Sequence, residues 1–196
     1  MLKAIASRLN FKSYNDILFW CAVCVGFFGF LRISEFTVDG AFDPEFDLSI
    51  EDVSFLPLIC AAVINIKQSK TDPFRKGASV TLGSTGTVIC PVRAITTYLK
   101  RRALDKGTLF RFSDGKTMSR AWFQARLKAA CASLALPGDY TAHSLRIGAA
   151  TAASAAGIPS VTIQTLGRWT SDAFKLYLRT PKQKLATLSR KLLFPK

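Results

Sequence analysis

The feature that most constrains the fold is a run of 15 apolar residues from Ile17 to Leu31, ILFWCAVCVGFFGFL. The run is apolar on nearly every face, which is the pattern of a helix buried in the middle of a domain. It is shorter than the roughly 20 residues that span a bilayer, and Arg32 and Glu35 end it. We therefore predict a buried central helix that delivers Arg32 and Glu35 at its C-terminal end.

The balance of charge favours a polyanionic partner. The chain has 27 lysines and arginines against 13 acidic residues, a formal net charge of +14. Residues 1–55 carry 4 basic and 8 acidic side chains, whereas residues 106–196 carry 15 basic and 3 acidic ones. We expect the back half to be the binding face, with nucleic acid ahead of membrane. The alternative is a merely soluble basic protein.

The five cysteines are scattered and predict no metal site. Cys21 and Cys24 form a C-x-x-C, but it lies inside the apolar run, so we interpret both as core residues. There is no second pair, and one histidine is too few to complete a zinc site. The N-terminus lacks the layout of a signal peptide. We expect an intracellular, reducing location, which is the nucleus if the host is eukaryotic.

Short strands are expected in the first half of the chain. Residues 39–52 carry six acidic and no basic side chains, which predicts a solvated loop. SIEDVSFL, LICAAVINIK, ASVTLG and TVICPV then have the length and alternation of strands. The turn KQSKTDPFRKG would place flexible cations at a hairpin tip, where they reach a phosphate or only keep an edge strand soluble. These cations are Lys67, Lys70, Arg75 and Lys76.

Helices are expected elsewhere. A short amphipathic helix is indicated over residues 2–10. Helix starts are indicated by Ser13 or Asn15, Pro91, Ser119, Thr141, Ser160 and Thr170 or Ser171. In the helix that follows Ser119, Arg120 and Arg126 would touch the DNA backbone or form a solvated face.

Residues 140–180 hold the only histidine of the chain. His143 and Arg146, at i and i+3, project to the same side of a helix that starts after Thr141. A positive helix start that carries an imidazole and a guanidinium holds a phosphate well. No carboxylate precedes Ser171 in this stretch, so a metal site with oxygen ligands is not expected here.

Together, the candidate residues can act on a phosphodiester. Two arginines can grip its non-bridging oxygens and stabilise the transition state. A tyrosine oxygen, ionised with the help of nearby cations, could displace a sugar oxygen that a lysine protonates. The set has no carboxylate pair for two-metal chemistry and no Gly-rich nucleotide loop. Its members are Arg32, Lys70, His143, Arg146, Trp169 and Tyr177.

These residues resemble the catalytic domain of the tyrosine recombinases, also called phage-type integrases. LRISEF is similar to the family's first arginine motif, and QSKT to its β-strand lysine motif. HSLR gives the His-x-x-Arg pair. LGRW places Trp169 where the family has histidine or tryptophan, and YLRT places Tyr177 as the nucleophile. Five motifs in the family's order make a specific signal. The sequences of these segments are most similar to those of recombinases from DIRS-like and Crypton-like eukaryotic mobile elements.

The resemblance implies an α+β, mainly helical domain with a small antiparallel sheet. We expect residues 1–196 to form one catalytic domain, and the separate N-terminal core-binding domain that the family normally has is not expected in this chain. The resemblance further implies a site-specific recombinase that breaks and rejoins double-stranded DNA through a 3′-phosphotyrosyl intermediate, in a homotetramer, with no metal or nucleotide cofactor. Its catalytic residues would be Tyr177, Arg32, Lys70, His143, Arg146 and Trp169, supported by Glu35, and its DNA contacts Lys67, Arg75, Lys76, Arg120, Arg126 and Arg168.

Two departures from the family, the expected lack of the N-terminal domain and the spacing before Tyr177, keep other functions open. Trp169 lies eight residues before Tyr177, a residue fewer than in most members. Two alternatives are a non-catalytic DNA-binding remnant of a mobile element and a type IB topoisomerase-like enzyme, which shares the chemistry.

Overall fold

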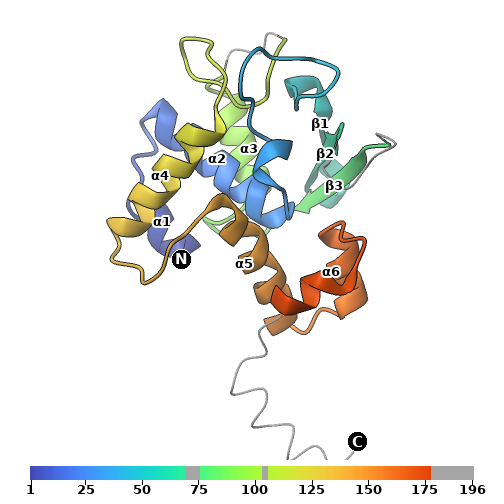
Figure 1. Cartoon of the computed structure of the whole chain (residues 1–196). Coiled ribbons are helices and arrows are strands. Elements are labelled where there is room, and N and C mark those ends of the chain that lie inside the picture. The colour runs from blue at the N-terminus through green and yellow to red at the C-terminus, as the bar shows by residue number, and fades with distance from the viewer. Residues whose placement is uncertain (69–75, 103–105, 178–196) are drawn as a thin grey trace, which may run out of the picture.

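The computed structural model describes residues 1–68, 76–102 and 106–177. Within these ranges, six α-helices and one small antiparallel sheet form a mainly helical α+β fold, with the sheet to one side of the helices (Figure 1). This confirms the fold class implied by the resemblance. Lys70 and Arg75 lie outside the described residues, and so does the side chain of Tyr177.

Helix α2 (Tyr14–Phe28) is the centre of the fold, as its apolar sequence predicts. Every residue from Ile17 to Val25 is buried in the core. The helix packs against α3 (Pro91–Leu99) and α5 (Ala142–Ala155), so it is covered on several sides. Burial raises the pKa of the Cys21 and Cys24 thiols, which fits the core-packing interpretation.

The sheet has the order β1-β2-β3, built from β1 (Val53–Leu56), β2 (Ala61–Ile66) and β3 (Ala78–Gly83). Both pairs are antiparallel; Ile64 of β2 stands opposite Val53 of β1 and Val80 of β3. Ile64, Ile66 and Leu82 turn one face of the sheet into the core. Three of the four expected strands are therefore confirmed.

The fourth expected strand, over residues 87–92, is wrong. The Thr85 hydroxyl donates to the Ile89 carbonyl at 2.9 Å, and the Ile89 N–H donates to the Thr87 hydroxyl at 3.1 Å. The Cys90 sulfur accepts the N–H of Arg93 and caps α3. These local side-chain contacts satisfy the backbone without a strand partner.

The remaining elements are short. Helices α1 (Leu2–Ala6), α4 (Arg120–Ala132) and α6 (Ser160–Leu166) lie close to their expected places. The Ser119 hydroxyl caps α4 by accepting the N–H of Trp122 at 3.2 Å. The 3₁₀ turns are η1 (Ile33–Glu35), η2 (Ile50–Asp52), η3 (Pro57–Ile59) and η4 (Asp172–Tyr177), and η4 stands where a helix bearing Tyr177 was expected.

Candidate active site

The first part of the site is the turn that follows α2. The helix stops at Phe28, and Phe30 takes a left-handed backbone conformation with φ 51°, which is uncommon for a bulky residue. Arg32 and Glu35 therefore lie on the separate turn η1, not at the end of the helix as expected. The Arg32 Nη1 donates to Glu35 Oε1 at 3.0 Å, and the Arg32 backbone N–H donates to Glu35 Oε2 at 2.9 Å.

Glu35 joins this turn to a distant part of the chain. Its side chain is 1% exposed. Besides Arg32 it binds Arg168, whose Nη2 donates to Glu35 Oε2 at 2.7 Å. The Nη1 of Arg168 donates to the Gly29 carbonyl at 3.2 Å. One buried carboxylate thus holds two guanidinium groups, and this pairing offsets the cost of burying its charge.

The second part of the site is α5, whose N-cap is Thr141. Arg146 is 2% exposed and donates to the carbonyls of Phe30 and Gly167. Its guanidinium carbon lies 4.4 Å from the centre of the Trp169 ring, in a cation–π contact. Arg146 therefore ties α5 to both the Arg32 turn and the LGRW segment.

His143 lies one turn before Arg146 and is exposed. Partial burial and the positive charges of Arg146 and Arg32 lower the pKa of its imidazole. The imidazole is therefore mainly neutral near pH 7. Arg146 donates to the carbonyl of Phe30, two residues before Arg32, and His143 lines one hollow with Ile33, the residue after Arg32. The Arg32 turn and the start of α5 therefore lie together, although more than 100 residues separate them in sequence.

These residues form an arginine cluster, defined here as Arg32, Glu35, His143, Arg146 and Arg168. Three guanidinium groups bring positive charge to it, and Glu35 supplies one negative charge. An excess of positive charge at a partly buried site favours an anion.

The segment that leads to Tyr177 is fixed against α5. The ring of Trp169 stacks on Phe174, with centroids 5.5 Å apart, and meets the edge of Phe30 at 6.1 Å. Phe174 of η4 is fully buried in a small core with Ala149 and Ala150 of α5. The last turn of η4, which ends at Tyr177, therefore follows an element that packs on the helix of His143 and Arg146.

Solved structures of recombinases share this fold. XerA recombinase aligns with a TM-score of 0.72 and 19% identity, covering 100% of this chain and 62% of that chain. XerH site-specific recombinase, in a post-cleavage complex with its difH substrate, gives 0.72 and 18%, covering 98% and 50%. A Flpe W330F–DNA Holliday junction complex gives 0.58 and 13%, covering 96% and 48%. The fold is that of a tyrosine recombinase catalytic domain.

The likeness lies in the fold more than in the sequence. No protein-family profile matches the chain, and no curated protein matches it. The chain spans roughly half to three fifths of the length of these recombinases, from 48% of Flpe to 62% of XerA.

An open hollow beside His143 extends the site of this recombinase fold. It is lined by Ile33, Asp39, Arg120, Ala121, Gln124, Thr141, Ala142 and His143. The Arg120 Nε lies 3.4 Å from an oxygen of Asp39, and about half of the Arg120 side chain is exposed. Arg120, an expected DNA contact, is therefore brought next to the arginine cluster.

Arg126, another expected DNA contact, is used inside the protein. Its Nη2 donates to Asp16 Oδ1 at 2.7 Å, and its guanidinium lies 5.1 Å from the ring centre of Phe19. Both partners belong to α2, so Arg126 braces α4 against the central helix and does not reach the hollow.

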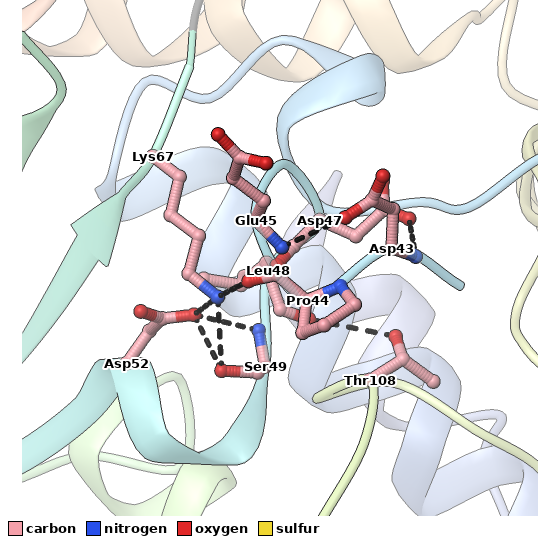
Figure 2. Close-up of polar contacts among 9 residues, drawn as sticks. All are labelled: Asp43, Pro44, Glu45, Asp47, Leu48, Ser49, Asp52, Lys67 and Thr108. Atoms are coloured by element: carbon pink, nitrogen blue, oxygen red, sulfur yellow. Dashed lines mark hydrogen bonds and ion pairs between the residues drawn. The ribbon is translucent and has the colours of Figure 1, made fainter. Parts of the chain in front are cut away.

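Lys67, also an expected DNA contact, makes its polar contacts within the protein. Its Nζ donates to the carbonyls of Pro44 and Asp47 at 2.8 and 3.1 Å and pairs with Asp52 at 2.8 Å (Figure 2). It donates to the Ser49 hydroxyl at 3.2 Å as well. Lys67 follows the last residue of β2, so these contacts attach the start of the β2–β3 connection to the acidic loop, residues 39–52. Most of residues 39–52 are exposed or half-buried, as expected for a solvated loop, but Leu48 and Ser49 are buried.

Another expected DNA contact, Lys76, lies at the edge of the residues that the structure describes. Lys76 is exposed and lines an open hollow with Asn65, Lys67 and Ser79, at the other side of the β2–β3 connection. In the described ranges no group of three His, Cys, Asp or Glu side chains could hold a metal ion. No helix of those ranges is both long and apolar enough to cross a membrane.

Proposed function

We propose that this chain is a site-specific DNA recombinase or integrase that breaks and rejoins strands through a 3′-phosphotyrosyl intermediate. The observation that carries the proposal is that the Arg32 turn meets the helix of His143 and Arg146: Arg146 donates to the Phe30 carbonyl, and His143 lines one hollow with Ile33. The segment that ends at Tyr177 packs on the same helix. The solved structures with this fold include recombinases bound to DNA, which supports double-stranded DNA as the partner.

In this mechanism the arginine cluster binds one phosphate of the DNA. Arg32 and Arg146 neutralise the non-bridging oxygens and the charge that grows on them in the transition state. Trp169 stacks on Arg146 and holds its guanidinium in place. The neutral imidazole of His143 accepts the proton that the Tyr177 phenol loses as its oxygen attacks phosphorus.

The Tyr177 oxygen attacks phosphorus, and the bond from phosphorus to the 5′ oxygen of the next sugar breaks. Lys70 gives the leaving oxygen a proton, so the products are a 3′-phosphotyrosyl ester and a free 5′-hydroxyl. The ester keeps the energy of the broken phosphodiester. Attack by a 5′-hydroxyl then reseals a strand and releases Tyr177 without ATP or a metal ion.

The remaining parts of the proposed function rest on the charge of the chain and on the sequences of its motifs. Lys76, Arg75 and Arg120 would contact the DNA backbone around the reacting phosphate, and strand exchange would take place in a homotetramer. The LRISEF and LGRW segments favour a eukaryotic mobile element of the DIRS-like or Crypton-like kind, acting in the nucleus.

Trapping of the covalent intermediate tests the proposal. The 196-residue chain is incubated with a pool of nicked duplexes of randomised sequence, from which a short cleaved fragment diffuses away and prevents resealing. We expect a protein–DNA adduct that survives denaturing electrophoresis. Tyr177→Phe should remove the adduct and leave the dissociation constant within about threefold, since a single phenol oxygen contributes little to DNA binding.

Tyr140→Phe is the matched control and should leave the adduct unchanged. An adduct that persists in Tyr177→Phe contradicts the nucleophile. Binding without any adduct from the wild-type chain supports the DNA-binding remnant instead. Relaxation of supercoiled plasmid with no preference for a site supports the topoisomerase-like enzyme.

A further inference from the structure

Two side chains of the LGRW segment, those of Arg168 and Trp169, lie at the site, and they make different contacts. Arg168 binds Glu35 at 2.7 Å and the Gly29 carbonyl at 3.2 Å, so it belongs to the arginine cluster. The Trp169 ring packs on Phe30 and Phe174 and covers the face of Arg146. The polar contacts of the segment with Glu35 thus come from Arg168.

The spacing along the chain agrees with this division. Trp169 precedes Tyr177 by eight residues, one fewer than the resemblance leads us to expect, whereas Arg168 precedes it by nine. The spacing from Arg168 to Tyr177 therefore equals the spacing that the resemblance leads us to expect before the tyrosine. No change in helix register is needed.

Arg168 is held in a costly position. It is a non-glycine residue with a left-handed backbone, φ 52°, and its side chain is only 16% exposed. Its Nε is buried and has no hydrogen-bond partner among the described residues. Burial is the largest cause that lowers the pKa of its guanidinium, against the raising effect of Glu35. An arginine kept under such conditions is more typical of a functional constraint than of a surface DNA contact.

We propose that Arg168 is a polar positioning residue of this segment, and that it acts on Arg32 through Glu35. The inference rests on the proposed function. By sharing the Glu35 carboxylate, Arg168 prevents that carboxylate from neutralising Arg32 alone. The Arg32 guanidinium then keeps enough positive charge, and a fixed direction, to bind the phosphate. The Trp169 ring packs against the face of the Arg146 guanidinium.

Neighbouring substitutions separate the two side chains. Arg168→Met removes the contact with Glu35, whereas Trp169→Phe keeps an aromatic ring on Arg146 and removes the indole N–H together with one of the two fused rings. Single-turnover adduct formation is measured on the pool of nicked duplexes, with dissociation constants and melting temperatures in parallel. We expect Arg168→Met to slow adduct formation about 100-fold or more with DNA binding within about threefold. Trp169→Phe should slow adduct formation by at most about tenfold, because a Phe ring still covers the Arg146 guanidinium.

A double variant tests the route through Glu35. In Arg168→Met, the carboxylate is left to Arg32 alone, so adding Glu35→Gln should recover about tenfold of the lost rate. A side chain that serves only packing would give no such recovery, because the second substitution then removes one more contact. Arg168→Lys, which keeps one donor to Glu35, should lie between Arg168→Met and the wild type.

The outcomes separate this inference from the proposed function. If the wild-type chain forms adducts but Arg168→Met does so at the wild-type rate, or if the double variant is slower than Arg168→Met, the role of Arg168 is wrong and the recombinase proposal stands. If Trp169→Phe is as slow as we expect for Arg168→Met, Trp169 carries the role. If the wild-type chain forms no adduct, the inference and the proposed function both fall.

Discussion

At the scale of single residues, the protonation of His143 links DNA binding to pH. The pKa of the free imidazole lies below its ordinary value because of partial burial and the charges of Arg146 and Arg32. A bound phosphate brings negative charge and raises this pKa again. The complex therefore takes up a proton when the pH lies between the pKa of the free protein and that of the complex.

DNA binding should consequently tighten as the pH falls through and below about 6.5, the ordinary pKa of histidine. Uptake of one proton gives at most about a tenfold change in the dissociation constant per pH unit. Fluorescence anisotropy of a labelled duplex, at constant ionic strength and from about pH 8 to pH 5.5, measures it. His143→Gln should flatten the profile, and an unchanged slope in that variant would contradict the linkage.

Residue types and short spacings could be predicted from the sequence, but their surroundings could not. The i, i+3 spacing of His143 and Arg146 was enough to place them on one side of a helix. Nothing local indicated that Arg146 would be buried, because its partners Phe30 and Gly167 lie 116 and 21 residues away. Arg168 was expected only as a DNA contact, although its nine-residue distance from Tyr177 was a signal that could have been used.

At the scale of elements, Lys67 connects the β2–β3 hairpin to the acidic loop. Lys67→Met would remove the only cation paired with Asp52 among the described residues and a donor from two carbonyls, so we expect a loss of about 1–3 kcal/mol of unfolding free energy. Lys106→Met is the matched control, because it breaks a solvent-exposed pair with Glu51 of the same loop, and it should change stability by less than about 0.5 kcal/mol. Urea unfolding of both variants measures the difference.

The salt dependence of DNA binding distinguishes Lys67 from Lys76. A lysine that contacts a phosphate contributes about one unit to the slope of log affinity against log salt. Lys76→Met should lower the slope by about this amount, and Lys67→Met should leave it unchanged. A reduced slope for Lys67→Met would restore Lys67 as a DNA contact.

The turn between α6 and η4 depends on the absence of a side chain at Gly167. A Cβ atom there would lie 1.6 Å from a carbon of the Trp169 ring, so the ring must move away and release Arg146. Gly167→Ala should destabilise the protein by about 1–3 kcal/mol and change the tryptophan fluorescence. Gly83→Ala is the control, since its Cβ meets nothing within 4 Å. Equal melting temperatures for both variants would contradict this packing.

Elements with strong local signals could be predicted, and those decided by side-chain contacts could not. The apolar run gave α2, Pro91 gave the start of α3, and Ser119 gave the cap of α4. The segment 87–92 has the alternation of a strand, but Thr85 and Thr87 bind its backbone locally, which no periodicity reveals. The left-handed Phe30 likewise separates Arg32 from the helix.

At the scale of the whole molecule, the fold brings two distant segments to one place. The turn after α2 supplies Arg32 and Glu35, and the back half supplies α5, the LGRW segment and η4. The central helix sits against α5, so the core that α2 organises also sets the distance between the two halves of the site (Figure 1). The uneven charge of the sequence agrees with the proposal that the basic back half faces DNA.

The most direct test of this account identifies the tyrosine that joins the DNA. The trapped adduct is digested with nuclease and protease, and the modified peptide is sequenced by mass spectrometry. We predict a nucleotide 3′-phosphate linked to Tyr177. Linkage to Tyr14, Tyr98 or Tyr140 would show that the arginine cluster does not serve the phosphate that the chain cleaves.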